Sequence, residues 1–306
     1  MRQVHLRIGL IALLSLVPAS ALLASVEIET QLVLVALPIA LLGVMHGALD
    51  PWVGDVVLRR FLGRSNRPLF FGAYLALMAV VVACWIVMPL QTLVAFLLIS
   101  VLHFGEQDAF AFASRKDGLS IAVFGAVPVL GPVAAHPVEV AMIFGWLTGM
   151  DGGALSEILR WLARPLIALW LVGAGMFIAR MFIEDDPNPR FQLFGLLVLV
   201  ASMLLLPPLI AFAAYFCLLH SFGHLLDMAA LESGPWADWT LQQWAARLWP
   251  ATLGALALGL VGWVSLSGMD LGNILYPEAL SQIIFCGLAA LTVPHVLLHM
   301  AFGQKT

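Results

Sequence analysis

The sequence predicts an all-α integral membrane protein, a polytopic bundle of about eight to ten transmembrane helices that forms one domain over residues 1–306. Composition is the first reason. The chain is 62% hydrophobic and 10% charged, whereas soluble domains average about 45–50% apolar and about 25% charged residues. Its mean hydropathy is +1.01. The apolar residues also gather into runs of about 20, the length of a helix that crosses a bilayer.

The candidate spans follow one another along the whole chain, and prolines mark the irregular places. Proline lacks a backbone N–H and disfavours helical geometry in the residue before it. Pro128, Pro132 and Pro137 therefore predict a broken helix, or a tight pair of helices, in the region 118–150. The candidate spans are 8–25, 31–50, 68–90, 91–113, 118–150, 160–183, 191–206, 208–230 (separated from its predecessor by Pro207-Pro208), 250–267 and 278–303.

The basic residues between the spans predict an orientation. Arg2 and Arg7 precede the first span, a cluster at 59–67 follows the second, and Arg115 with Lys116 follow the fourth. All three groups lie on one side of the membrane if the N-terminus is cytoplasmic, as the positive-inside rule requires. The basic start and first apolar run also fit a signal peptide. Because another apolar run begins at Gln31, we expect an uncleaved first helix.

Charge and cysteine content exclude other classes of protein. The net charge is −4, the isoelectric point is near 6.0, and no basic patch is visible, so we expect no nucleic-acid partner. The three cysteines, Cys84, Cys217 and Cys286, lie far apart in apolar runs. They offer no disulfide framework and no CxxC pair.

Histidine is the informative residue type in this chain. Ionisable groups are expensive in hydrocarbon, so an intramembrane histidine usually has a partner or a function. Two of the eight histidines, His5 and His136, lie near predicted surfaces and receive no role. The other six lie in strongly apolar stretches: His46, His103, His220, His224, His295 and His299.

The spacing of these histidines favours a metal site inside the membrane. Residues three and four apart share a helix face, so His220 and His224 can bind one ion jointly. The predicted orientation also places His46 and His103 at comparable depth. Imidazole ligands suit iron, copper, zinc or nickel, and ligating histidines usually donate their other N–H to a carboxylate, a carbonyl or water. The carboxylates near the histidines are Asp50, Glu106, Asp108 and Asp227.

Several of these residues keep a second interpretation. The three aspartates lie near predicted helix ends, where a carboxylate can instead reach water. Glu106 is also a candidate proton carrier or solvated group. His295 and His299 repeat the i, i+4 spacing without a nearby acid, and the sequence leaves three roles open for them. The first is to complete the metal site, the second is to form another metal site, and the third is to hydrogen-bond between helices.

At these residues the chain resembles the Brp/Blh family of bacterial and archaeal membrane β-carotene 15,15′-dioxygenases. The resemblance runs in family order from about residue 40 to residue 300. Together the motifs are specific, although none is specific alone. They are His46-Gly-Ala-Leu-Asp50, His103-Phe-Gly-Glu106-Gln-Asp108, Tyr215-Phe-Cys-Leu-Leu-His220-Ser221 with His224, and Leu291-Thr-Val-Pro294-His295.

The resemblance implies a function and a ligand set. It implies that iron(II) and O₂ split β-carotene, or a related carotenoid, at its central double bond into two retinals. It also implies that His46, His103, His220 and His224 hold the iron, in the inner membrane of a bacterial or archaeal cell, where the carotenoid reaches the protein from the lipid. Asp50, Glu106, Asp108, Asp227 and His295 are then candidate supports for the ligands, and His299 is a further candidate ligand.

The chain departs from the family pattern at two places, and rival functions remain. Phe222-Gly223 replaces a usual Pro-Arg pair, and His299 stands where an apolar residue is expected. His103 and Asp108 have the spacing of nickel and cobalt permeases, but Ala109 stands where those carry a histidine. A metal or proton transporter, a di-iron desaturase or hydroxylase, a haem protein and a structural membrane protein are the alternatives. No adjacent histidine pair, which the di-iron enzymes need, occurs in the chain.

Overall fold

A computed structural model describes residues 2–113, 116–184, 186, 188–231, 236, 238–267 and 276–303. Within these residues all regular structure is helical and no strand occurs, which confirms the all-α prediction. Nine stretches of the described chain are long and apolar enough to cross a bilayer, so the protein is a multi-pass membrane protein. Arg115, part of the predicted orientation signal, lies outside the described residues.

The helices follow the predicted spans closely, with turns of 3₁₀ or π geometry between some of them. They are α1 (Arg2–Leu16), η1 (Val17–Ala19), α2 (Ser20–Ala24), α3 (Ile28–Pro38), η2 (Ile39–Gly43), η3 (Val44–Leu49), α4 (Asp50–Leu62), α5 (Arg67–Val87), α6 (Pro89–Phe112), α7 (Gly118–Ala135), α8 (Pro137–Thr148), α9 (Gly152–Ile183), α10 (Pro189–Leu205), α11 (Pro208–Tyr215), η4 (Phe216–Ser221), α12 (Phe222–Ala229), α13 (Leu241–Ser267) and α14 (Pro277–Gly303).

The proline-containing region 118–150 is a pair of helices, α7 and α8. The break falls at His136, which is forced out of helical geometry (φ −129°, ψ 51°) because Pro137 follows it and begins α8. Pro128 and Pro132 lie inside α7 without ending it. The structure thus has the pair, one of the two alternatives that the sequence left open, and only the last of the three prolines makes the break.

The second span is longer than predicted and is not one regular helix. Instead of ending at residue 50, it continues to Leu62 as α3, η2, η3 and α4. The π-helical turn η2 and the 3₁₀ turn η3 lie directly before Asp50. A second π-helical turn, η4, interrupts the span 208–229 and contains His220. Such turns inside helices leave carbonyls without their regular partners and occur frequently at functional sites.

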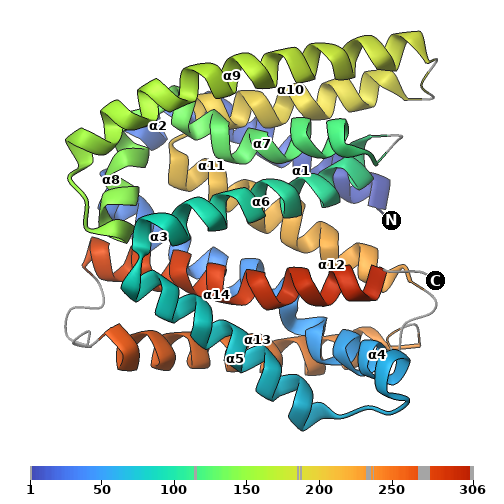
Figure 1. Ribbon diagram of the computed structural model, residues 1–306. Helices are drawn as coiled ribbons and strands as arrows, with labels where there is room; N and C mark the ends of the chain where they lie inside the picture. The colour runs from blue at the N-terminus through green and yellow to red at the C-terminus, as the bar shows by residue number, and fades with distance from the viewer. Residues whose placement is uncertain are drawn as a thin grey trace.

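The long helices lie side by side with roughly parallel axes, as Figure 1 shows. α7 packs against α6, α9 and α10, while α14 packs against α4, α5 and α8. In this view α14 lies between α6 on one side and α5 with α13 on the other (Figure 1). The segments that carry the six intramembrane histidines, η3, α6, η4, α12 and α14, thus meet in the interior of the bundle.

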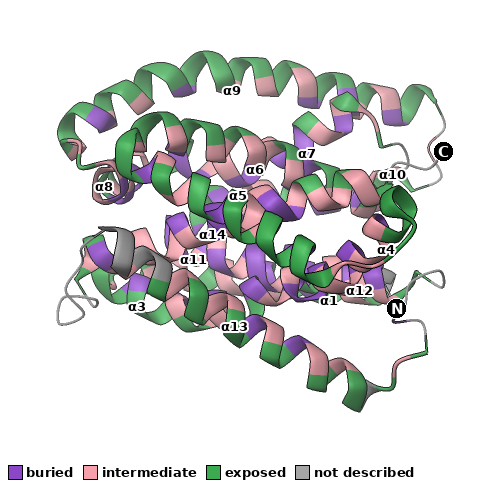
Figure 2. Ribbon diagram, turned by 60° about the horizontal axis from the view of Figure 1, so that its bottom comes forward, coloured by how far each residue is buried: buried purple, intermediate pink, exposed green. Residues whose placement is uncertain are grey.

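The outer surface of the bundle is apolar. On α9, Trp161, Leu169, Val172 and Ile183 are mostly exposed, and Figure 2 shows the outer face of this helix in the colour of exposed residues. An apolar surface of this extent is not stable in water, but it is the surface expected for helices that face lipid tails.

Two glycines bring α6 and α7 into backbone contact next to His103. A Cβ atom on Gly105 would overlap the backbone carbonyl of Ile121, and one on Gly125 would overlap the carbonyl of Val101. Small residues permit this close approach of membrane helices. The contact fixes the position of α6, and with it the depth of the His103 side chain in the bundle.

Candidate metal centre

The six intramembrane histidines meet in two adjacent groups of three. His46, His103 and His220 each offer a ring nitrogen within 4.8 Å of the other two, and His224, His295 and His299 do the same among themselves. We call these the first triad and the second triad, and together the six-histidine centre. The two triads touch, because the ring centroid of His295 lies 4.8 Å from that of His46 and 5.3 Å from that of His103.

Three distant segments supply the first triad. The Nε2 atoms of His103 on α6 and His220 on η4 point at each other, 3.1 Å apart. Two nitrogen ligands at about 2.1 Å from one ion and about 90–110° apart are separated by about 3.0–3.4 Å. The ring of His46 lies 5.6 Å from that of His220 and 6.2 Å from that of His103. The separation of 3.1 Å fits a shared ion as well as a single N–H···N bond between the two imidazoles.

The irregular turns orient the histidines of the first triad. Nδ1 of His46 lies 2.5 Å from the carbonyl oxygen of Gly43, so it carries the proton and leaves the lone pair on Nε2, available to a metal ion. Ser221 donates to the same carbonyl and to that of Leu42. Gln107 donates to the carbonyl of His220, 2.5 Å away. The free carbonyls of the π-helical turns are thus satisfied by side chains that lock the turns in place.

The second triad combines α12 with α14. The ring of His224 lies 4.8 Å from that of His299 and 5.2 Å from that of His295, compared with 6.0 Å from that of His46. The structure therefore divides the expected set of four ligands between the triads, with His224 beside the second. His220 and His224 do share a helix face, but they lie a turn apart and reach different triads.

Asp50 supports the second triad. It is 2% exposed and accepts a hydrogen bond from Nδ1 of His295, at 2.9 and 3.0 Å to its two oxygens. The hydroxyl of Tyr74 donates to Asp50 at 2.8 Å. Nε2 of His299 lies 3.4 Å from Oδ1 of Asp50 but makes no hydrogen bond to it. The carboxylate next to His46 in sequence therefore orients His295, a residue 245 positions away.

The other predicted acids have different surroundings. Asp108 is buried and accepts a hydrogen bond from the hydroxyl of Tyr215, 2.7 Å away. The alternative that Asp50 and Asp108 reach water is wrong, because both are buried. Glu106 is exposed, although it is three residues from His103. Asp227 is half-buried on α12.

Sequence reasoning missed two tyrosines and one glutamine. Tyr74 and Tyr215 each hold a buried carboxylate, and Gln107 holds the backbone at His220. A signal existed for the tyrosines, since the chain has only three and two of them fall in the middle of predicted spans. Apart from the place of Gln107 in the His103–Asp108 motif, nothing in the sequence indicated its contact with the backbone at His220.

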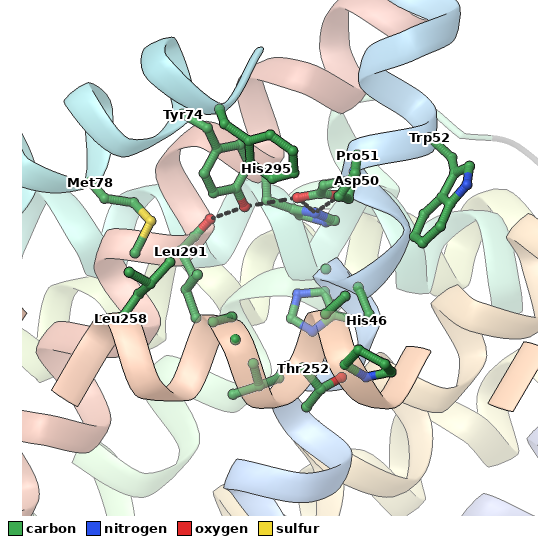
Figure 3. Close-up of a pocket in the computed structure, with 18 of the residues that line it drawn as sticks. His46, Asp50, Pro51, Trp52, Tyr74, Met78, Thr252, Leu258, Leu291 and His295 are labelled. Carbon is green, nitrogen blue, oxygen red and sulfur yellow. Dashed lines mark hydrogen bonds and ion pairs between the residues drawn. The ribbon is translucent and has the colours of Figure 1, made fainter. Parts of the chain in front are cut away.

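An apolar cavity of about 530 Å³ opens beside the centre between α5, α13 and α14. His46, Asp50 and His295 form part of its wall, and Tyr74 lies over Asp50 there (Figure 3). The rest of the wall is mostly hydrocarbon. Figure 3 labels Met78, Leu258 and Leu291 among those lining residues.

The donor set suits a transition metal ion. Each triad offers three imidazoles and no carboxylate, a set that iron, copper, zinc and nickel accept and that magnesium and calcium do not favour. Nε2 of His224, His295 and His299 is buried without a hydrogen-bond partner, and these three rings lie together. Buried polar atoms are nearly always paired, so this group of unpartnered nitrogens fits a centre built to bind metal.

Comparisons with known proteins point to one family. A sequence model of the β-carotene 15,15′-dioxygenase family matches residues 37–302. The "Beta-carotene 15,15'-dioxygenase" of an uncultured marine bacterium, 66A03, is 29% identical over 264 residues, which cover 85% of this chain and 90% of the relative. The "Probable beta-carotene 15,15'-dioxygenase Blh" of Halobacterium salinarum is 24% identical over 294 residues, covering 83% and 79%.

No solved structure matches the chain. The matched region begins before His46 and ends after His299, so it includes the whole six-histidine centre and the wall of the cavity. The chain therefore belongs to the β-carotene 15,15′-dioxygenase family, and with it to the carotenoid-cleaving dioxygenases.

Proposed function

We propose that the chain uses iron(II) and O₂ to cleave β-carotene, or a closely related carotenoid, at the central 15,15′ double bond into two molecules of retinal. The observation that carries this proposal is the apolar cavity whose wall includes His46 and His295, in a member of this family. A long hydrocarbon substrate needs an apolar channel that leads to a metal centre. Family membership favours this function over a transporter, a desaturase and a haem protein.

Histidines of the six-histidine centre would hold the iron. His46, His103 and His220 supply three neutral ligands, and His224, the fourth histidine of the expected set, belongs to the same centre. Neutral imidazoles leave the charge of the metal uncompensated and its other coordination positions open. When bound, the iron supplies the activation of O₂, which the side chains of this protein cannot perform alone.

The cavity would bind the polyene and exclude water from it. Phe71, Leu75 and Leu258 line the cavity and are also 45%, 41% and 52% exposed on the outer surface. The cavity therefore reaches the surface that faces lipid, between α5 and α13. A carotenoid dissolved in the bilayer can enter there without crossing water, and its central bond can approach the wall at His46.

The membrane setting extends this proposal. We expect the protein in the inner membrane of a bacterial or archaeal cell with a cytoplasmic N-terminus, because the basic residues of the first loops share one side in that orientation. Lipid is then both the solvent of the protein and the reservoir of its substrate. Protease or thiol-labelling accessibility from the two sides of inverted vesicles measures this orientation.

Expression in bacteria that accumulate β-carotene tests the activity directly. The wild-type chain should remove the orange colour and produce retinal, and unchanged carotene would refute the proposal. Alanine substitutions at His46, His103, His220 and His224 should each abolish retinal formation and lower the iron content of the purified protein. His136→Ala is the matched control, because His136 lies outside the centre and bonds to the carbonyl of Leu204.

A further inference from the structure

A second apolar cavity, of about 90 Å³, lies between α6, α7, α8 and α11. Among the described residues, its wall shares no member with the wall of the larger cavity of about 530 Å³. Helices α5 and α13 border the larger cavity and α6 borders the smaller one, and these helices lie on opposite sides of α14 in Figure 1. We call it the small cavity, and its lining includes Leu97, Ser100, Val129, Phe144 and Leu209.

The wall of the small cavity offers no group that would hold water. Among the described lining residues, Ser100 carries the only polar side chain, and its hydroxyl donates to the carbonyl of Phe96 in the same helix at 2.8 Å. The other lining side chains are those of leucine, isoleucine, valine, phenylalanine and proline. A cavity of about 150 Å³ with such a lining stays dry and binds benzene or xenon. The small cavity therefore suits a small apolar molecule.

The volume of the small cavity restricts the choice further. A water molecule takes up about 30 Å³ in the liquid, so a cavity of about 90 Å³ holds a small molecule only. Half of a carotenoid, a substituted ring with a long polyene, is far larger. O₂ is diatomic and has no dipole, so it fits both the volume and the wall.

Phe104 connects the small cavity with the first triad. It lines the cavity, and its ring centroid lies 4.7 Å from that of His220 and 6.1 Å from that of His103. The Nε2 atoms of these two histidines point at each other, 3.1 Å apart. A single phenyl ring thus contacts both the cavity and the imidazoles that would hold the iron.

A second connection also consists of phenyl rings. Phe212 lines the small cavity and stacks on Phe216, with 5.3 Å between the ring centroids. The ring of Phe216 lies 5.5 Å from that of His46 and 5.7 Å from that of His220. Both connections from the cavity to the first triad therefore run through hydrocarbon side chains, which an apolar gas passes more readily than water or ions do.

A separate route for O₂ matters once the carotenoid is bound. The polyene would fill the larger cavity, whose wall includes His46 and His295, and would cover that side of the centre. O₂ dissolves better in hydrocarbon than in water, so the lipid supplies it. Leu97 in the wall of the small cavity is only half-buried, and its neighbour Leu98 is 62% exposed on the outer surface. The small cavity thus lies close to the lipid, on the other side of α14 from the larger cavity.

We propose that the small cavity binds O₂ taken from the lipid and passes it to the first triad past Phe104. This inference rests on the proposed function, in which O₂ is a substrate. The carotenoid and O₂ then reach the metal from two different sides, and the bound carotenoid does not block O₂. The lining of the small cavity determines how well the protein uses O₂, and the lining of the larger cavity determines how well it binds the carotenoid.

Xenon binding tests the small cavity without turnover. Crystals of the full-length protein are pressurised with xenon, and anomalous difference density locates the gas. We expect xenon beside Leu97 and Val129 in the wild type, and its loss in Leu97→Trp, which fills the cavity with an indole. Leu98→Trp is the matched control and should keep the xenon, because Leu98 faces outward on the same helix. A wild-type protein without xenon in the small cavity would overturn the inference.

The dependence of the rate on O₂ is the second readout. Retinal formation is measured at varied O₂ with saturating carotenoid, and then at varied carotenoid in air. Leu97→Trp should lower kcat/KM for O₂ several-fold and leave KM for the carotenoid and the iron content unchanged, whereas Leu98→Trp should change none of these. Val129→Phe fills the cavity from α7 and should act like Leu97→Trp, so the test does not depend on the folding of one variant.

The outcomes separate this inference from the proposed function. Retinal formation with an unaltered dependence on O₂ in both filled variants would overturn the inference and leave the proposed function standing. If the filled variants lost affinity for the carotenoid instead, the small cavity would belong to the polyene and the inference would be wrong. A wild-type chain that binds xenon there but forms no retinal would refute the proposed function and leave the cavity as a gas-binding site.

Discussion

Tyr74 offers the sharpest test of how the centre is supported. Its hydroxyl donates to Oδ2 of Asp50 at 2.8 Å and lies 3.4 Å from the carbonyl oxygen of Leu291. Tyr74→Phe removes this hydroxyl and keeps the ring, which forms part of the cavity wall. Asp50 would then keep His295 as its hydrogen-bond donor. The substitution therefore removes the polar contacts of one hydroxyl group in the interior of the bundle, of which the contact with Asp50 is the shorter.

The expected magnitude follows from the kind of hydrogen bond that is lost. A hydrogen bond to a charged group stabilises a protein by about 1.5–3 kcal/mol, and one between neutral groups by about 0.5–1.5 kcal/mol. We expect Tyr74→Phe to lower the free energy of unfolding by about 1.5–3 kcal/mol. Tyr276→Phe is the matched control, because Tyr276 is 61% exposed. Surface changes of this kind usually alter stability by no more than about 0.5 kcal/mol.

The assay is equilibrium unfolding of the metal-free protein in mixed micelles with increasing sodium dodecyl sulfate, followed by the fluorescence of its ten tryptophans. The metal-free form is used so that the result does not depend on metal affinity. If Tyr74→Phe and Tyr276→Phe changed the free energy of unfolding equally, the contact with Asp50 would contribute nothing. Tyr74 would then have no part in orienting His295.

Two further substitutions test the helix contact and the cavity. Gly105→Ala should destabilise the protein by about 1–3 kcal/mol, because the new Cβ atom would overlap the backbone of α7. Gly175→Ala is the control and should not destabilise the protein, because Gly175 has open space around it. Equal thermal stability of the two variants would contradict the proposed backbone contact. Leu258→Trp should fill the cavity and lower retinal formation by about tenfold or more at unchanged metal content. Leu253→Trp, on the exposed face of the same helix, is its control, and equal retinal yields would remove the cavity from the substrate path.

Hydropathy and proline positions predicted most of the fold. Long apolar runs have few alternatives to a spanning helix in lipid, so nearly every candidate span corresponds to a helix in the structure. The exact point of a break was less predictable. Pro128 and Pro132 remain inside α7, where the loss of a backbone hydrogen bond is tolerated, and only Pro137 coincides with the helix end. Which proline breaks a helix depends on packing, which the sequence pattern does not contain.

The pairing of acids with histidines was less predictable, for a geometric reason. The i, i+4 rule assumes about 100° of rotation per residue, which leaves Asp50 about 40° from His46 around a regular helix. The 3₁₀ turn η3 covers Val44–Leu49 and rotates by about 120° per residue, so the same four steps leave the two about 120° apart. Asp50 therefore faces α14 and meets His295. The spacing of hydrophobic residues in the sequence does not predict such a turn.

The same irregular turns explain why six ionisable side chains can meet in an apolar bundle. A regular helix satisfies its own carbonyls, but η2 and η4 leave carbonyls at Leu42, Gly43 and His220 that accept hydrogen bonds from side chains of the centre. Several ring nitrogens in this region have no hydrogen-bond partner within the protein. Metal binding removes that cost only in the folded state, so it must stabilise the fold. Folding and loading of the centre are thus thermodynamically coupled, and a histidine substitution lowers stability most in the metal-loaded protein.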